Sequence, residues 1–158
     1  QGLPVLAHQE SALHRAGEAL DATRPHASRD LASAIERDPQ LATQAAGGNT
    51  SGAAKAMAEE QRVRLDPDAR AERFVKDWRG MTQARAGMER AGDRAGAEKL
   101  GKRMAGVAGG LHRDPQLESA LKRRAPELAL KMERGRSIGD ELARSIGPER
   151  TRDRGMSL

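Results

Sequence analysis

Apolar residues recur every three or four positions along most of the chain, a spacing that is typical of amphipathic helices. Leu6, Leu13, Ala16 and Leu20 lie on one stripe and predict a first helix over residues 5–22. The same spacing predicts four further helices before residue 92: from Pro25 to the Asp-Pro step at 38–39, from there to Ala46, from about Ser51 to about Leu65, and from Asp66-Pro67 to about Ala91.

The last of these helices has the most regular apolar face. Phe74, Trp78, Met81 and Met88 follow one another at spacings of four, three and seven, which places them on one side of a helix. A Gly-Asp pair at 92–93 leads into a partner helix that reaches Leu111, and so short a connection predicts an antiparallel hairpin. We interpret the glycines of the partner helix as packing residues: Gly96, Gly101, Gly106, Gly109 and Gly110.

The remainder of the chain contains shorter apolar segments. Leu117 continues the stripe, which is predicted to run as far as Met132. Residues 133–136 are predicted to form a joint. Ser137 is predicted to cap a last short helix that ends at the Gly-Pro pair at 147–148.

The pentapeptide Arg-Asp-Pro-Gln-Leu occurs twice, at 37–41 and at 113–117. Asp is a strong N-cap, and Pro at the first helical position loses nothing by lacking an N–H. Pro also disfavours the helical conformation of the residue before it, so it ends the incoming helix. Each copy therefore predicts a corner between two helices, and a third Asp-Pro step repeats the device. We assign a structural role to Asp38, Pro39, Asp66, Pro67, Asp114 and Pro115.

Composition supports a helical fold for the 158 residues. Phe74 and Trp78 are the only aromatic side chains, so Ala, Leu and Met must fill most of the interior. No alternating run with hairpin chemistry indicates a sheet. The two aromatic rings, one helical turn apart, are compatible with a stacking platform for nucleic-acid bases or with the centre of the core. Because Met81 and Met88 share their face, we favour the core and assign both rings a structural role.

The net charge of +5 is unevenly distributed. Residues 99–158 carry 14 Lys and Arg against 8 Asp and Glu, whereas residues 1–98 carry 14 against 15. Arg outnumbers Lys by 22 to 6, and its planar guanidinium pairs in a bidentate manner with carboxylates or phosphates. The basic C-terminal part therefore indicates an acidic partner surface or nucleic acid. The alternative is a solvated, Arg-rich surface typical of a GC-rich genome.

The sequence contains no catalytic constellation. Residues Gly96 to Lys102 follow the spacing of a phosphate-binding loop, but Arg103 replaces the Ser or Thr that would hold magnesium, and no strand precedes the loop. Cys is absent, and the four His residues lack metal-ligand spacing. We therefore predict that this segment is not an enzyme and holds no metal, cofactor or small-molecule ligand. Its longest apolar run, 104–111, is too short for membrane insertion.

Three stretches of the C-terminal half carry a resemblance to a known family. They are Ala-Glu-Arg-Phe-Val-Lys-Asp-Trp at 71–78, Lys-Arg-Met-Ala-Gly-Val-Ala-Gly-Gly-Leu at 102–111, and Arg-Asp-Pro-Gln-Leu-Glu-Ser-Ala-Leu-Lys-Arg-Arg-Ala-Pro-Glu-Leu at 113–128. These three stretches resemble the C-terminal end of Ti-type conjugative relaxases, the TraA-like proteins of alpha-proteobacteria. That end is similar to the BID domain of type IV secretion effectors from Bartonella. The resemblance is strongest over 67–146.

The resemblance implies an all-α fold, an elongated antiparallel four-helix bundle with short extra helices forming a hook at one end. We place this BID-like bundle at 1–136 and assign 137–158 to a short helix and a flexible basic C-terminal tail. The chain begins with Gln-Gly, and we expect it to be a domain of a longer protein. The resemblance implies that this parent is a relaxase with DNA nicking and helicase activity upstream.

The function implied by the resemblance is that of a translocation signal for type IV secretion. The bundle and tail would dock on the coupling protein, an ATPase, and the parent would pass from the bacterial cytoplasm into a recipient cell during plasmid transfer. Arg150, Arg152 and Arg154 resemble the alternating arginines of C-terminal signals in Agrobacterium-type substrates. We assign partner binding to these three, to Arg144, and to the basic run of Lys122, Arg123 and Arg124.

Two further functions remain as alternatives. One is an accessory helical domain that grips DNA non-specifically through residues 99–154. The other is a BID domain of a secreted effector.

Overall fold

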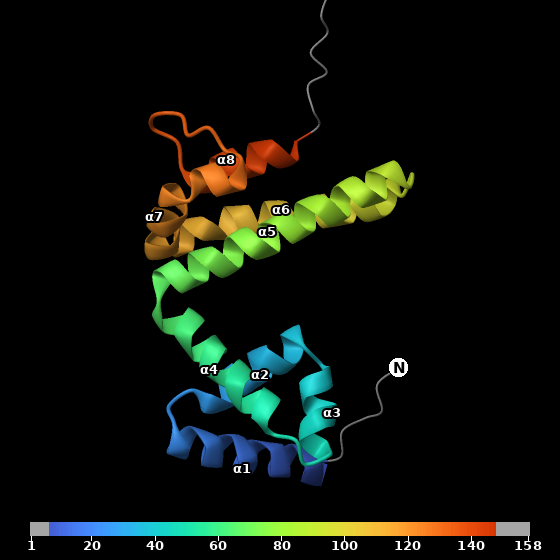
Figure 1. Cartoon of the computed structure of the whole chain (residues 1–158), viewed down its shortest axis with the longest axis vertical. Helices are drawn as coiled ribbons and strands as arrows, with labels where there is room; N and C mark the ends of the chain where they lie inside the picture. Colours follow the sequence, from blue (N-terminus) through green and yellow to red (C-terminus); the bar gives the residue numbers. More distant parts are fainter. Residues whose placement is uncertain (1–6, 148–158) are drawn as a thin grey trace, which may run out of the picture. The chain divides into compact units, whose positions relative to one another are not determined.

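The structure is a computed structural model that describes residues 7–147 of the chain. Within these residues the protein is all-α, with eight α-helices, two short 3-10 helices and no strand (Figure 1). The predicted helices up to residue 110 are confirmed to within about two residues at each end, except that the predicted start of the first helix at residue 5 lies outside the described residues. The chain divides into two compact units, the first ending at Asp66 and the second beginning at Pro67.

This division differs from the predicted one, which placed a single bundle at 1–136 and a separate segment after it. The structure does not confirm a single four-helix bundle over 1–136. The break falls at the third Asp-Pro step, where Asp66 adopts an extended conformation (φ −112°, ψ 114°) because Pro67 disfavours a helical one. The last helix, over Ile138–Ile146, packs inside the second unit.

The first unit comprises α1 (Ala7–Thr23), α2 (Ala27–Arg37), α3 (Gln40–Ala46) and α4 (Ser51–Leu65). Helix α2 packs against the other three helices, and α3 also contacts α4. The interior of this unit is thin, because alanine is its commonest buried residue. Its buried apolar side chains are Ala27, Ala34, Leu41, Ala53 and Val63.

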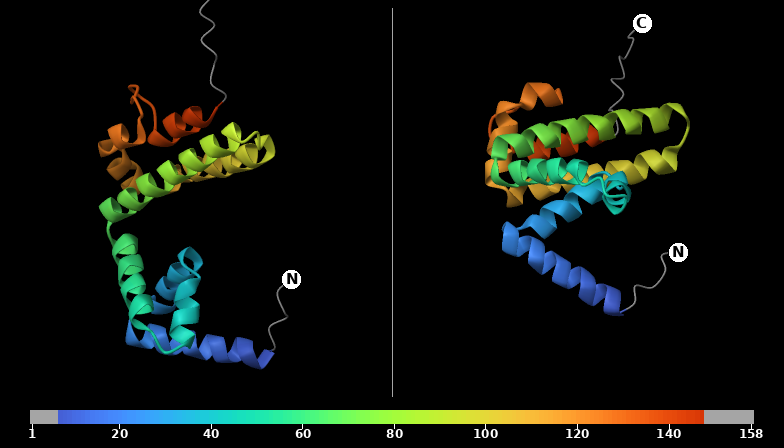
Figure 2. Two further views of the ribbon diagram at one scale, coloured as in Figure 1. Left: turned by 45° about the vertical axis from the view of Figure 1, so that its right-hand side comes forward. Right: turned by 60° about the horizontal axis from the view of Figure 1, so that its bottom comes forward.

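The second unit comprises α5 (Pro67–Arg90), α6 (Arg94–Gly110), η1 (Leu111–Arg113), α7 (Pro115–Arg123), η2 (Ala125–Leu128) and α8 (Ile138–Ile146). Helices α5 and α6 form the predicted antiparallel hairpin, and α8 lies against α6 (Figure 2). At the hairpin turn, Gly92 has a φ of 79° and the carboxylate of Asp93 caps α6 by accepting from the Gly96 amide. The larger side chains of the core lie here: Trp78, Met104, Leu111, Leu121, Ile138 and Leu142.

The two copies of the repeated pentapeptide form similar but not identical corners. The Asp114 carboxylate caps α7 by accepting from the Leu117 amide at 3.0 Å, and Pro115 is the first residue of that helix. In the other copy the Asp38 carboxylate accepts from the Gln40 amide at 3.1 Å, and Pro39 precedes α3. Both copies therefore turn the chain between helices, as predicted, but only the second forms a full side-chain cap.

The chain between η2 and α8 departs from the prediction. The apolar stripe expected to reach Met132 stops earlier, because Ala129 adopts a left-handed conformation (φ 56°) and ends η2. Residues 130–137 then form an irregular connection in which Met132 is partly exposed. The predicted cap of the final helix is confirmed, since the Ser137 hydroxyl accepts from the Asp140 amide at 3.0 Å.

Candidate partner-binding surface

The cations predicted to bind a partner at the end of α7 and directly after it already form ion pairs within the second unit. Lys122 Nζ lies 3.5 Å from Glu118 Oε1, and Arg123 Nη2 lies 2.8 Å from Asp68 Oδ1. Arg124 Nη1 lies 3.1 Å from Glu127 Oε1. The side chains of Lys122 and Arg123 are at least half exposed. Their charges are therefore accessible, although the paired carboxylates partly compensate them.

The remaining predicted cations belong to α8 and the C-terminal segment. Arg144 is exposed near the end of α8 and has no ion-pair partner among residues 7–147. Arg150, Arg152 and Arg154 lie outside the described residues. The structure therefore brings only Arg144 to an accessible position with its charge uncompensated by a described carboxylate.

A groove that the sequence did not predict lies between α5, η2 and α8. It has a volume of about 450 Å³ and is lined by both apolar and polar side chains, and we call its apolar side chains the floor. Five side chains from four segments of the chain line this floor: Trp78, Met104, Leu128, Leu130 and Ile146. Trp78 and Met104 are almost completely buried and belong to the core, so the floor of the groove is also the outer wall of the core.

Two arginines of α5 form the polar rim of this groove, and each binds the carboxyl end of a neighbouring helix. Arg79 Nε and Nη2 donate to the Glu127 carbonyl oxygen at 2.9 and 2.7 Å. Arg85 Nη1 donates to the Ile146 carbonyl oxygen at 2.7 Å, and its Nε lies 3.1 Å from Glu89 Oε1. A guanidinium at the end of a helix interacts favourably with the free carbonyls there. These contacts attach η2 and α8 to α5.

A second hollow of about 480 Å³ continues the first along α5. The two share Arg79, Gln83 and Glu127, and we call them together the α5 groove. Four cations line the α5 groove, against the two carboxylates of Glu72 and Glu127: Lys76, Arg79, Arg85 and Arg124. Within the described part of the chain, neither Lys76 nor Arg79 has a carboxylate partner. The rim of the groove is therefore basic.

Of the predicted partner-binding residues that the structure describes, only Arg124 lines the α5 groove. Sequence reasoning missed Lys76, Arg79 and Arg85, because isolated cations on a helix are ordinary and nothing in their spacing shows which carbonyls they meet. The stacked rings were interpreted correctly. Phe74 and Trp78 have centroids 5.7 Å apart and planes 11° apart, and Trp78 is only 4% exposed. The core interpretation is confirmed, and a buried ring cannot serve as a platform for bases.

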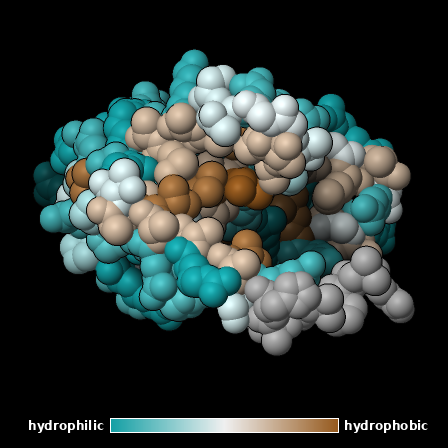
Figure 3. Space-filling view, turned by 90° about the horizontal axis from the view of Figure 1, so that it is seen from below, coloured by the Kyte–Doolittle hydropathy of each residue, from teal (hydrophilic) through white to brown (hydrophobic). Residues whose placement is uncertain are grey.

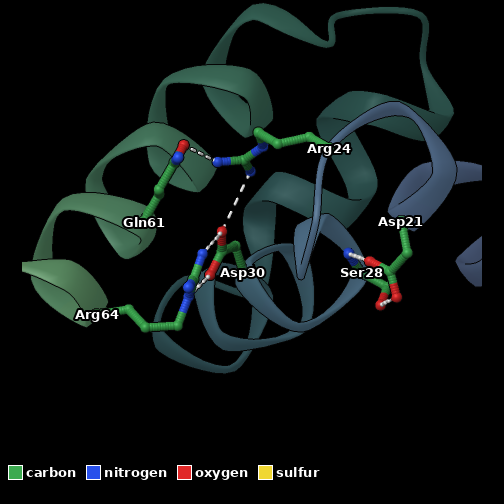
Figure 4. A network of polar contacts seen from close by, with 6 residues as sticks. All are labelled: Asp21, Arg24, Ser28, Asp30, Gln61 and Arg64. Atoms are coloured by element: carbon green, nitrogen blue, oxygen red, sulfur yellow. Dashed lines mark hydrogen bonds and ion pairs between the residues drawn. The ribbon is translucent and has the colours of Figure 1, made fainter.

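The first unit contains a polar network around a buried carboxylate (Figure 4). Asp30 of α2 is 2% exposed and receives Arg64 of α4 in a bidentate arrangement, Nε to Oδ1 at 3.1 Å and Nη2 to Oδ2 at 3.3 Å. Arg24 Nη2 lies 3.3 Å from the same Oδ2, and Arg24 also donates to Gln61. The hydrogen bonds that Arg64 donates to the Asp30 carboxylate raise the pKa of Arg64. The network joins α2, α4 and the α1–α2 connection, and we interpret it as structural.

A separate contact fixes the connection between α1 and α2. The Ser28 amide and hydroxyl both donate to the Asp21 carboxylate at 2.8 Å. The backbone hydrogen bond, followed by that of the hydroxyl, lowers the pKa of Asp21. This carboxylate is therefore held in its charged form by local structure.

Exposed apolar side chains do not indicate a further partner-binding site. Leu13 and Leu65 are more than 60% exposed. In the view of Figure 3, hydrophobic side chains lie among hydrophilic ones near the middle of the surface. Single exposed apolar residues are ordinary on protein surfaces. Among residues 7–147, no group of three His, Asp or Glu is placed to hold a metal ion. No helix in the same range is both long and apolar enough to cross a membrane.

Comparison of the chain with protein-family models, with curated proteins and with solved structures found no match in any of the three. The function therefore has to be argued from the sequence and from the surface described above.

Proposed function

We propose that this chain is a translocation-signal domain for type IV secretion, which docks on the coupling protein so that a parent relaxase is transferred with its DNA strand. The observation that carries the proposal is a shared N-terminal boundary. The resemblance to the relaxase C-terminus is strongest over 67–146, and the second structural unit begins at Pro67 and includes α8, which ends at Ile146. The segment with the resemblance is thus a compact unit of its own, as a docking module needs to be.

The charge distribution supports the same proposal. The second unit, from residue 67 to the end, carries 21 Lys and Arg against 14 Asp and Glu, whereas residues 1–66 carry 7 against 9. The positive charge is therefore concentrated in the unit that carries the resemblance. A concentrated positive field favours association with an acidic partner surface. The proposal includes the arrangement that the family implies: an elongated four-helix bundle with a hook and a flexible basic tail.

A transfer assay tests the proposal. Residues 1–158 are fused behind a site-specific recombinase in a donor strain that carries a Ti-type conjugation system, and recombination is counted in recipient cells. We expect transfer that depends on the coupling protein and falls strongly when residues 149–158, with three of the assigned arginines, are deleted. No transfer of the complete fusion would refute the proposal. Unchanged transfer after the deletion would refute the role of Arg150, Arg152 and Arg154 alone.

One observation favours the DNA-binding alternative. Lys99 and Arg103 lie one helical turn apart on the exposed side of α6, and neither has a carboxylate partner among the described residues. Such cations bind phosphates without sequence preference, and the affinity falls steeply with salt. A titration of the chain with duplex DNA over rising salt tests this function, and no binding at low salt would remove it. The secreted-effector alternative shares the docking step and differs only in the parent protein.

A further inference from the structure

We propose that the α5 groove binds an apolar side chain that projects from an acidic segment of the partner protein. The inference deepens the proposed function by naming the chemistry of the docking site, and it rests on that function for the identity of the partner. Two properties of the groove carry it: an apolar floor and a basic rim.

The floor selects an apolar group. Leu128, Leu130 and Ile146 lie beside the almost completely buried Trp78 and Met104 at a concavity of about 450 Å³, large enough for a Leu, Met or Phe side chain. Burial of such a side chain strengthens binding by about tenfold or more, which makes it an anchor. A polar group at the same place would lose its water and gain few hydrogen bonds from this floor.

The rim selects negative charge beside the anchor. Arg79 donates only two of its five N–H groups, both to a carbonyl oxygen, so its positive charge is not compensated by any described carboxylate. Lys76 lies one turn away on α5 and likewise lacks a carboxylate partner among residues 7–147. Carboxylates on either side of the anchor would form charge-assisted hydrogen bonds with both cations.

A nucleic acid fits this groove less well than an acidic protein segment. The floor offers nothing to a phosphate, and Trp78 presents no open face for a base because it is 4% exposed and stacked on Phe74. A protein segment with an apolar residue between Asp and Glu residues satisfies both the floor and the rim. Charge complementarity and shape therefore favour the protein partner.

The sole tryptophan is one of the residues that line the groove, so its fluorescence is the first readout of occupancy. The probe is the peptide acetyl-Asp-Glu-Leu-Asp-Glu-amide, titrated to millimolar concentration into residues 1–158. The comparison peptides are the same sequence with Leu replaced by Ser, and a version with Lys at each acidic position. A short oligothymidylate represents nucleic acid. Amide chemical shifts of residues 127–130 and 144–146 locate the binding.

We expect saturable binding of the acidic Leu peptide with shifts at these residues. The Ser peptide is expected to bind about tenfold more weakly, from the lost burial of one apolar side chain. Arg79→Gln is expected to weaken binding severalfold and Arg79→Lys to recover part of the loss. The matched control Arg94→Gln removes an exposed arginine of α6 that does not line the groove, and it should leave binding unchanged.

Several results would overturn the inference: no saturable signal, equal binding of the Leu and Ser peptides, equal or tighter binding of the Lys peptide or the oligothymidylate, or equal losses in Arg79→Gln and Arg94→Gln. The transfer assay separates this failure from that of the proposed function. If the unmodified fusion transfers and Arg79→Gln transfers equally well, the groove inference is wrong and the proposed function stands. If the unmodified fusion does not transfer, the proposed function fails and the titration still decides whether the groove binds acidic segments.

Discussion

The contact between α8 and α6 makes Gly139→Ala a sensitive test of the second unit. A Cβ atom added at Gly139 would lie 2.7 Å from the Ala108 carbonyl oxygen of α6, whereas ordinary contacts begin at 3.4 Å. The obstacle is backbone, so the methyl group can be accommodated only if the two helices move apart. Overpacking of this kind costs typically about 1–3 kcal/mol. The gain in helix propensity from Gly to Ala, at most about 1 kcal/mol, is smaller at the first turn of a helix.

Urea unfolding followed by Trp78 fluorescence measures the effect, because the only tryptophan belongs to the core of this unit. With a slope of about 1 kcal/mol per molar urea for a unit of this size, we expect the midpoint to fall by about 1–2 M. Gly106→Ala is the matched control. No atom lies within 4 Å of its added Cβ, and the position is exposed in the interior of α6.

The control should therefore move the midpoint in the opposite direction. Replacing a helical Gly by Ala without strain stabilises by roughly 0.5–1 kcal/mol, and the midpoint should rise by about 0.5–1 M. A midpoint for Gly139→Ala at or above that of the unmodified chain would refute the close approach of α8 to Ala108. An unchanged slope in both variants shows that the surface exposed on unfolding is the same and that the comparison is valid.

Three other predictions concern the corners and the polar contacts. Asp114→Ala should destabilise the second unit by about 1 kcal/mol in urea unfolding, because the bond to the Leu117 amide is lost; a cost near zero would contradict the capping role. Because its folded pKa is lowered, Asp21 contributes stability above the ordinary pKa of 3.8, and this contribution is lost as the pH falls through the folded value. NMR titration should find the Asp21 pKa below 3.8. Ser28→Ala should raise this pKa only part of the way to 3.8, because the backbone amide of residue 28 still donates to the carboxylate. An Asp21 pKa of 3.8 in both proteins would exclude the contact. Asp30→Asn should speed amide exchange of α2 and α4 while that of α5 stays unchanged, because it weakens the pairing with Arg64; exchange unaffected in all three helices would show that the network does not hold α2 to α4.

The helices were predictable because their ends are fixed by local chemistry. Pro67 and Pro115 begin α5 and α7, Asp93 and Ser137 cap α6 and α8, and each of these signals acts within four residues. The hairpin of α5 and α6 followed in the same way from its short connection. The packing role predicted for the glycines of α6 holds only in part. A Cβ atom at Gly101 would contact Ile146, but Gly106, Gly109 and Gly110 have open space where a Cβ would lie.

The division into two units and the candidate site were not predictable. Whether helices on either side of Asp66 share one core depends on contacts between distant segments, and periodicity carries no information about them. The α5 groove depends on Arg79 meeting a carbonyl 48 positions away, and on Ala129 adopting a left-handed conformation without the help of glycine. Buried Asp30 was missed for the same reason, since its partner Arg64 lies 34 positions further along the chain.

The alanine-rich interior of the first unit gives the Asp30 network a role in specificity. Alanine side chains have no rotamers and little shape, so helices that meet through alanine can shift along one another at small cost. A buried carboxylate that must meet Arg64 in a bidentate manner allows only one register between α2 and α4. Buried polar groups of this kind select one arrangement at some expense of stability. An apolar replacement of the whole network would thus be expected to give a unit that resists unfolding better and is less uniquely packed.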